Sequence, residues 1–347
     1  MQRSASLKMP GTLKDIAQEL NLSISTVSCA LKDGPKVVSP EIRSRVREAA
    51  SRIGYRPNRI ARSLVTGRTH TVGVVPMYVD VDSLLHPYLQ LSLNGIFNAA
   101  NEIEQDVLVF TARDRHRVLA SADNLLDGRV DGVIFVSPRP NSPALKVVCE
   151  SGLPYSVLYE ASNGNSFTVD NRAGVRRAIE HLVALGHRHI AHVTGDVALS
   201  DGLDRRDAFL EAVAEFDLHT AQDLLIGGNF TRLSGQNAGH AIAAMSPRPS
   251  AVLCGNDDIA AGLLQTLKEH RIRCPRDISV IGFDGVTAPE HLKPALTTIR
   301  QPAQEMAASA LHAVVSSIES GVSVPSRVFQ PDLVIRASTA PVKENIQ

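Results

Sequence analysis

The sequence predicts a small all-α helix-turn-helix domain at the N-terminus, followed by a larger α/β domain built from two Rossmann-like lobes. Three observations support this fold class. The 347 residues exceed the usual size of one domain. Two short amphipathic segments joined by a tight polar turn lie near the start of the chain. From residue 71 onward, apolar bursts of strand length alternate with helical stretches, and about six such βα units favour two parallel sheets over one.

Charge is divided unevenly along a chain whose formal net charge is zero. Residues 1–70 hold 13 Lys and Arg against 5 Asp and Glu, whereas the remaining residues hold 23 against 31. A basic N-terminal region on an acidic body predicts a polyanion bound at one end only.

Composition also indicates where the protein works. The four cysteines, Cys29, Cys149, Cys254 and Cys274, lie far apart and form no CxxC pair, so we expect reduced thiols and no disulfide framework. The sequence has neither a membrane-length apolar segment nor the apolar run of a secretory signal near its start. These features favour a cytoplasmic protein.

The first two helices are predicted from their start signals. Thr12 and Asp15 form a T-x-x-D capping pattern, and the apolar residues that follow share one helical face. Asn21 tolerates a left-handed turn, and Ser23 then caps a second helix. We expect Val27 and Leu31 of that helix to face the first one, leaving its other side outward.

A third helix should begin at Ser39-Pro40-Glu41 and close a small core with apolar residues spaced four, three and four apart: Ile42, Val46, Ala49 and Ile53. Its other face carries Arg43, Arg45, Arg47 and Arg52. Small polar residues on the outward helix fit the major groove, and surrounding basic side chains neutralise phosphates. By itself the pattern leaves a solvated three-helix cap as an alternative.

From Thr12 onward the chain closely resembles the lactose-repressor/galactose-repressor (LacI/GalR) family, in TLKDIAQELNLSISTVS (12–28) and VSPEIRSRVREAASRIGYRPNRIARSL (38–64). In that family residues corresponding to 58–64 form a hinge helix that orders on operator binding. Leu64 aligns with the leucine that opens a base step in the minor groove. A helix this short is only marginally stable by itself in water. Its folding is therefore expected to depend on DNA and a partner subunit.

The resemblance places Ile24, Ser25 and Cys29 at the positions that contact base edges. Many relatives have Arg or His in place of Cys29, and a thiol is a weak donor, so packing and direct base contact remain equal alternatives for this residue. The predicted DNA-binding residues are Thr12, Ser23, Ile24, Ser25, Thr26, Ser28, Cys29, Asn58, Arg59, Ala61, Arg62 and Leu64.

The body resembles the same family in residues 130–137, 169–195, 255–267, 274–285 and 296–302. The resemblance implies a periplasmic-binding-protein-like fold whose chain crosses between lobes near 168–170, 298–302 and 328–332. We therefore predict a helix-turn-helix domain (1–56), a hinge helix and linker (57–69), and an effector-binding and dimerisation domain (70–347). Lobe one spans about 70–168 and 302–328, and lobe two about 170–298 and 330–340.

Effector-binding residues are also implied by the resemblance, because ligands in such folds bind beyond the carboxyl ends of strands, between the lobes. Arg205, Asn256 and Asp284 occupy positions that hold effector polar groups, although Arg206 leaves room for a shift of one residue. Asn256 and Asp284 have helix-cap and strand-end-cap alternatives. Phe230 corresponds to an aromatic against the apolar face of the ligand. Weaker candidates are His86, Tyr88, Ser137 and Gln301.

No catalytic, cofactor or metal site is predicted. The run from His187 to His192 looks like a metal cluster, but strand alternation would put His187 and His189 on one face and His192 on the other. Nucleotide-binding, nucleophile-elbow and zinc-protease motifs are absent from the sequence.

The predicted function is that of a ligand-responsive, sequence-specific transcription regulator, by family habit a repressor, that binds a pseudo-palindromic operator as a homodimer. A sugar or sugar derivative is the default effector, and the tail after Arg336 has no heptad that would build a coiled-coil tetramer. The alternative is a cytosolic sugar-binding protein or sugar-metabolising enzyme without specific DNA binding. Effector identity, operator sequence, regulated genes and the direction of the response are left open.

Overall fold

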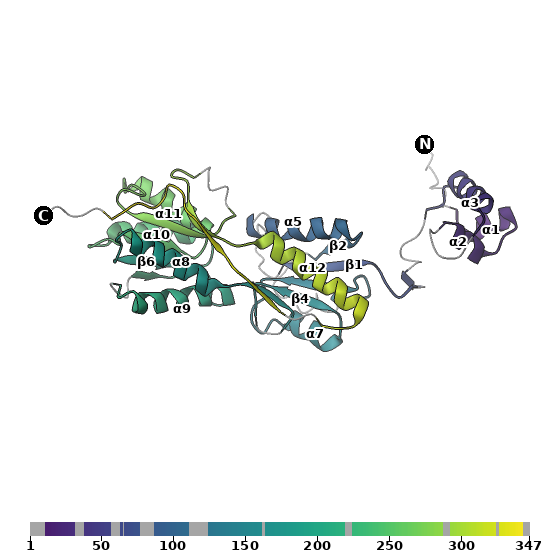
Figure 1. Cartoon of the computed structure of the whole chain (residues 1–347), viewed down its shortest axis with the longest axis horizontal. Coiled ribbons are helices and arrows are strands. Elements are labelled where there is room, and N and C mark those ends of the chain that lie inside the picture. The colour runs from purple at the N-terminus through teal and green to yellow at the C-terminus, as the bar shows by residue number, and fades with distance from the viewer. Residues whose placement is uncertain are drawn as a thin grey trace, which may run out of the picture. The chain divides into compact units, whose positions relative to one another are not determined.

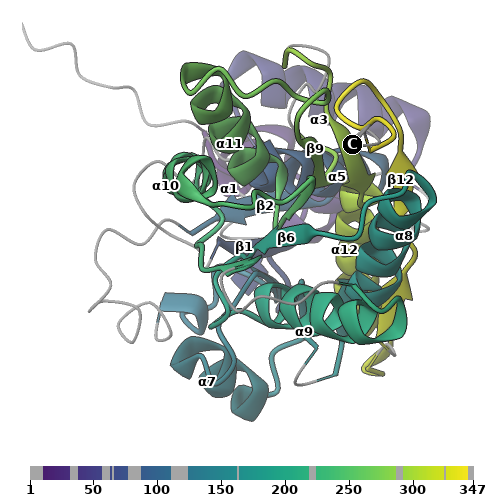
Figure 2. The same cartoon turned by 90° about the vertical axis from the view of Figure 1, so that its left-hand side faces the viewer.

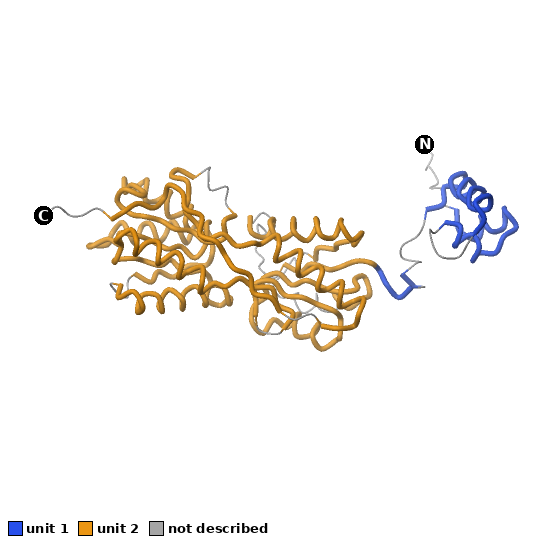
Figure 3. The backbone as a smooth tube through the Cα atoms, in the orientation of Figure 1, with its two compact units in different colours: residues 1–69 blue, residues 70–347 orange. Residues whose placement is uncertain are grey.

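The computed structural model describes residues 11–31, 38–56, 63–64, 66–76, 87–110, 124–161, 164–218, 224–286, 292–323 and 326–342. The chain forms two compact units, residues 1–69 and residues 70–347 (Figure 3). Each unit has its own buried core and is described separately.

The described core of the first unit is built from the helices α1 (Leu13–Leu20), α2 (Ile24–Leu31) and α3 (Pro40–Arg52). Their core is built around the fully buried side chains of Ile16, Val27 and Val46. The inward face predicted for α2 is confirmed, because Val27 is fully buried and Leu31 packs against the core, and Ala30 is buried beside them.

The helix starts follow the predicted capping chemistry. Thr12 and Asp15 form a complete capping box on α1, and Asn21 ends that helix in the left-handed region with φ 52°. The Ser23 hydroxyl accepts from the backbone N–H of Thr26 at 3.1 Å, and the Ser39 hydroxyl caps α3. Short side chains thus set the turn between α1 and α2.

The second unit contains two six-stranded sheets, one in each lobe. The lobe-one sheet is entirely parallel, with the order β11-β5-β4-β3-β1-β2. Its strands are β1 (Thr71–Pro76), β2 (Asp106–Val109), β3 (Gly132–Val136), β4 (Tyr155–Leu158), β5 (Ser166–Val169) and β11 (Arg327–Phe329). Helices α5 (Pro87–Glu102) and α12 (Ala303–Ser320) cover one face, and α7 (Pro143–Ser151) covers the other (Figure 1).

The lobe-two sheet has the order β12-β10-β9-β8-β6-β7, and only β12 runs antiparallel to its neighbour. Its strands are β6 (Ile190–Val193), β7 (Leu225–Ile226), β8 (Ala251–Cys254), β9 (Ser279–Asp284), β10 (Thr297–Arg300) and β12 (Asp332–Val334). Figure 2 shows α10 (Arg232–Ala244) and α11 (Asp257–Glu269) on one side of β6, with α8 (Asn171–Ala184) and α9 (Ser200–Glu215) on the other.

Both lobes are discontinuous in sequence. The chain leaves the lobe-one sheet after β5, returns to lobe one after β10, and crosses again between β11 and β12. Three connections therefore join the two lobes.

The end of the described chain packs against lobe two. The backbone N–H of Val280 donates to the Ser338 carbonyl at 2.8 Å, and that of Val342 donates to the Leu185 carbonyl at 2.8 Å. Across the described residues, no helix has both the length and the apolar character needed to cross a membrane.

Candidate functional site

A cavity of about 80 Å³ lies between the two lobes of the second unit. The two sides differ in chemistry. Lobe one contributes an apolar and aromatic wall, made of Pro76, Tyr88, Leu89, Val136, Ser137, Pro138 and Tyr159. Lobe two contributes three charged side chains, one amide and two large apolar side chains. These are Asp201, Arg205, Asp284, Asn256, Leu199 and Phe230.

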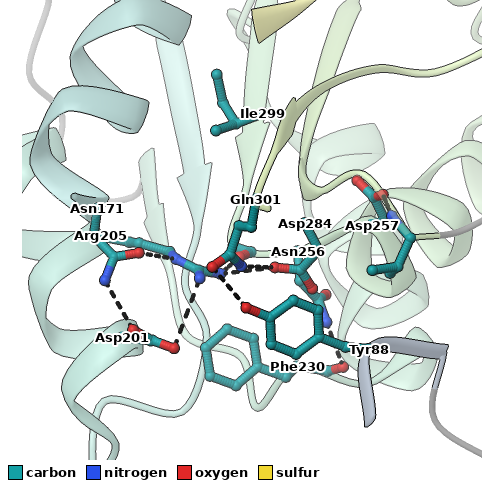
Figure 4. A network of polar contacts seen from close by, with 12 residues as sticks. Tyr88, Asn171, Asp201, Arg205, Phe230, Asn256, Asp257, Asp284, Ile299 and Gln301 are labelled. Atoms are coloured by element: carbon teal, nitrogen blue, oxygen red, sulfur yellow. Dashed lines mark hydrogen bonds and ion pairs between the residues drawn. The ribbon is translucent and has the colours of Figure 1, made fainter. Parts of the chain in front are cut away.

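Arg205, on the inner face of α9, is the centre of the polar network and is only 2% exposed. Its Nε donates to Asn171 Oδ1 at 2.8 Å, and its Nη1 donates to the Gly255 carbonyl at 2.8 Å and to Asp284 Oδ1 at 3.3 Å (Figure 4). The guanidinium carbon lies 3.8 Å from the centre of the Phe283 ring. Its plane is therefore fixed by three hydrogen bonds and a stacking contact.

Asp284 ends β9, where parallel strands present their last side chains to the cleft. Its Oδ1 also accepts from Gln301 Nε2 at 2.7 Å, and Gln301 Oε1 accepts from the Tyr88 hydroxyl at 2.7 Å. Gln301 lies in the connection between β10 and α12, so this chain of bonds joins Tyr88 of lobe one to Asp284 of lobe two.

A second carboxylate, that of Asp201, approaches the same guanidinium. Asp201 lies one turn before Arg205 on α9, and its Oδ2 is 3.8 Å from Arg205 Nη2. The other oxygen of Asp201 accepts from Asn171 Nδ2 at 2.8 Å. One buried guanidinium thus forms ion pairs with two carboxylates.

The pKa values of both carboxyl groups are raised. Burial raises the pKa of Asp284 well above its ordinary value, and the charges of Asp257 and Asp201 add to the shift against the pull of Arg205. Burial likewise raises the pKa of Asp201, with contributions from Asp204 and Glu160. Burial therefore disfavours the ionised form of both groups, and a nearby cation would stabilise it.

Asn256 and Phe230 form a joined pair at the lobe-two side. Asn256 Oδ1 accepts from the Ile259 backbone N–H at 2.9 Å and so caps α11, while its Nδ2 donates to the Phe230 carbonyl at 3.0 Å. The helix-cap role considered for Asn256 is therefore observed, although the residue also lines the cavity.

Four residues that line the cavity have positive φ values without being glycine: Ser137, Tyr159, Phe230 and Asp284, at 49°, 68°, 64° and 111°. Such conformations cost of order 1–3 kcal/mol each and persist where the surroundings impose them. Their concentration here indicates that the cavity is built for a purpose other than stability.

The sequence-predicted effector residues are distributed as follows. Tyr88, Ser137, Arg205, Phe230, Asn256 and Asp284 line the cavity, and Gln301 is buried behind it and acts through Tyr88 and Asp284. Arg206 points elsewhere and pairs with Asp207 at 2.6 Å, so Arg205 is the residue in the cleft. His86 lies outside the described residues.

Three residues of the site were missed by the sequence analysis: Asn171, Asp201 and Tyr159. Asn171 and Tyr159 come close behind the carboxyl ends of β5 and β4, which is where ligand groups gather in parallel sheets. Asp201 is four residues before Arg205 on one helix face, a spacing that brings their side chains together.

The second candidate site is the outward face of α2 in the first unit. Ile24 is 52% exposed and Ser25 is also exposed, whereas Ser28 and Cys29 are half-buried. Thr12 and Ser23 serve as caps, and the Ser23 hydroxyl contacts the hydroxyls of Ser25 and Thr26, each at 2.8 Å. The face offers small hydroxyls and one apolar side chain at the end of a helix.

The predicted hinge is described only at its end. Asn58, Arg59, Ala61 and Arg62 lie outside the described residues, while Ser63 and Leu64 are helical. Leu64 is 83% exposed.

Histidines in the 187–192 run make separate contacts. His187 bonds to Ser250 and to the Ala340 carbonyl, and His189 bonds to the Arg248 carbonyl. Within the described part of the chain, no group of three or more His, Cys, Asp or Glu side chains is arranged to hold a metal ion.

His192 gives a prediction about pH. It donates from Nδ1 to the Leu253 carbonyl at 2.9 Å, stacks on Phe209, and its buried Nε2 has no hydrogen-bond partner among the described residues. Burial lowers its pKa to about 4, so the unfolded chain binds this proton more readily between about pH 6.5 and 4. His192 should therefore cost the fold about 3 kcal/mol of stability as pH falls through that window.

The measurement compares urea unfolding of the original chain and His192→Gln from pH 7 to pH 4. The stability advantage of the original chain should shrink by about 3 kcal/mol toward pH 4. His189→Gln, which replaces a half-buried histidine bonded to the Arg248 carbonyl, is the control for the substitution itself. A pH-independent gap for His192→Gln would contradict the assignment.

Family comparisons match part of each of the two units. Residues 12–58 match the family described as bacterial regulatory proteins, lacI family, and residues 179–339 match the periplasmic binding protein-like domain. The HTH-type transcriptional repressor PurR of Pectobacterium atrosepticum is 31% identical over 316 residues, covering 89% of this chain and 91% of that repressor.

Two solved structures are similar over nearly the whole chain. A complex of the transcriptional regulator CelR with cellobiose shares 27% identity, with a TM-score of 0.73 and coverage of 94% of this chain and 99% of that one. The Lac repressor bound to ONPG shares 26% identity, with a TM-score of 0.84 and coverage of 95% and 100%. The predicted fold class is confirmed. The chain therefore belongs to the LacI family of bacterial regulatory proteins, and it is a helix-turn-helix DNA-binding transcription regulator rather than an enzyme.

Proposed function

We propose that this regulator binds a pseudo-palindromic operator as a homodimer, acts in the cytoplasm, and responds to a small sugar-like metabolite held between its lobes. The observation that carries the proposal is the buried Arg205 network in the interlobe cavity of a chain that also has a DNA-binding unit. The similar CelR structure contains cellobiose, which supports a carbohydrate as the ligand class.

Ligand entry must rearrange the cleft. Cavities for small ligands usually measure about 300–1,000 Å³, and the space between these side chains is about 80 Å³. A sugar-sized effector would therefore replace some contacts in the chain that runs from Tyr88 through Gln301 to Asp284. Because those bonds join the lobes, their replacement changes lobe geometry, with a reciprocal coupling to DNA of typically about 1–3 kcal/mol.

On the DNA side, Ile24, Ser25 and Cys29 are proposed to face base edges, with Thr12, Ser23, Thr26 and Ser28 beside them. Asn58, Arg59, Ala61, Arg62 and Leu64 are proposed to form the minor-groove hinge, which needs two subunits. The dimer is the proposed assembly, because a hinge of this kind acts in pairs.

Ser25→Glu tests the DNA-binding face. A carboxylate on this exposed helix start would meet phosphates and base acceptors, so operator affinity should fall roughly 10- to 100-fold, the equivalent of about 1–3 kcal/mol. Duplexes are first selected from a random library with the full chain and then measured by gel shift at physiological salt.

Gln18→Glu is the matched control, because it adds the same charge on the exposed face of α1. It should leave affinity within about threefold of the original. Failure of the full chain to prefer any duplex over random DNA would refute the proposed function.

A further inference from the structure

The charges of the interlobe cavity do not balance. Of the described residues that line it, Asp201 and Asp284 are acidic and Arg205 is the one basic residue. Glu160 is buried next to this group, where it accepts from the Ser200 hydroxyl at the start of α9, and it adds to the raised pKa of Asp201. The described lining therefore has two acidic side chains for one basic side chain, in a setting where burial disfavours the ionised acids unless a cation is near.

Arg205 has little left to offer an anion. Its Nε and Nη1 donate to Asn171, the Gly255 carbonyl and Asp284, so among the described residues Nη2 is the nitrogen that has no hydrogen bond. Asp201 Oδ2 already lies 3.8 Å from that nitrogen. A ligand carboxylate or phosphate bound to Nη2 would meet the carboxylate of Asp201 in a buried, weakly screening environment.

A positively charged ligand group would find favourable contacts in the same cavity. Asp284 accepts from both Arg205 and Gln301 through Oδ1, and its side chain borders the cavity. The rings of Tyr88, Tyr159 and Phe230 line the same space, and aromatic faces attract ammonium groups. A positively charged ligand group would thus supply the charge that the two carboxylates lack.

We propose that the effector is a small polyhydroxylated molecule carrying a protonated amine, and that carboxylated or phosphorylated sugars are excluded. The inference rests on the proposed function in one respect, that the cavity is the effector site. The amine binds between Asp201 and Asp284, and the uncharged ring lies against the aromatic wall of lobe one.

The test uses matched sugars with the full chain: D-glucosamine, D-glucose and D-glucuronate, and the corresponding galactose series. Binding is measured by calorimetry at about pH 6.5, below the pKa of roughly 8 of an amine beside electron-withdrawing groups. We expect the amino sugar of at least one series to bind about tenfold more tightly than the neutral sugar, with the acid weakest. Equal affinity for amine and hydroxyl, tighter binding of an acid, or no amino sugar bound at 10 mM or below would overturn the inference.

Two variants test whether the preference for an amino sugar over the neutral sugar depends on Asp201. Asp201→Asn should reduce the amine preference at least about fivefold. Asp207→Asn, on the same helix but paired with Arg206 away from the cavity, should leave it unchanged. If Asp201→Asn fails to fold, the ligand order of the original chain still decides. Gel shifts run in parallel separate the outcomes: specific DNA binding without an amine preference overturns only this inference, whereas loss of specific DNA binding overturns the proposed function.

Discussion

Replacing Arg205 by alanine is expected to destabilise the second unit by about 3–5 kcal/mol, the cost of removing one partner from a buried ion pair. The change leaves Asp284 and Asp201 buried without their cation. It removes the hydrogen bonds that Arg205 donates to Asn171 Oδ1 and to the Gly255 carbonyl. It also removes the central polar group of the proposed effector site. We therefore expect effector binding to be lost together with stability.

Arg206→Ala is the matched control for Arg205→Ala. Arg206 is the next residue on α9 and is half-buried, and its ion pair with Asp207 lies near the surface. Its removal should cost no more than about 1 kcal/mol. Urea unfolding of the full-length chains, followed by circular dichroism, measures both values. Similar losses for the two variants would show that the network around Arg205 contributes nothing beyond an ordinary surface pair.

Gly262→Ala is expected to destabilise lobe two by about 3 kcal/mol or more, because α10 and α11 touch at their backbones. A Cβ at Gly262 would lie 2.0 Å from the Arg232 carbonyl oxygen, and one at Gly235 would lie 1.9 Å from the Ile259 carbonyl oxygen. The helices would have to separate. Phe230 and Asn256 stand just before these helices and would move with them, so ligand affinity should fall as well.

Gly227→Ala controls for the loss of a glycine as such. An added Cβ at Gly227 meets nothing within 4 Å, and its φ is outside the left-handed region. Its stability should stay within about 1 kcal/mol of the original chain, because alanine only restricts the unfolded state. Thermal unfolding of both variants checks the pair. An unchanged melting temperature for Gly262→Ala would mean that the two helices can separate at little cost.

Much of the fold follows from the sequence alone. Seven apolar bursts, TVGVV, DVLVF, DGVIFVS, SVLY, HIAHVT, SAVLCG and ISVIGF, predicted the strands β1, β2, β3, β4, β6, β8 and β9. Buried parallel strands consist largely of branched apolar residues, which is why these stretches stand out. The strand β10 was not predicted, because its Thr297 and Thr298 look polar. In the fold both are buried, with the Thr298 hydroxyl bound to Asp257 and the Thr297 N–H bound to Ser338. Those partners come from distant parts of the chain, which no local pattern contains.

The candidate effector site was also predicted only in part. Arg205, Asp284 and Phe230 were predicted by resemblance, and all three line the cavity. The second carboxylate, that of Asp201, was not predicted, because its place depends on Asp201 and Asn171 meeting where the starts of α8 and α9 come together. Cys29 remains a prediction, since its half-buried position fits both direct base contact and packing.

The discontinuity of lobe one sets an order for biosynthesis. The first unit takes its core from within residues 13–55, whereas the core of lobe one includes Met306, Leu311 and Phe329. The stretch between Thr69 and Phe329 is 260 residues long, which a ribosome translates at roughly 5–20 residues per second. Each nascent chain thus carries a complete DNA-binding head for tens of seconds before the ligand-sensing body can close around its own last strands.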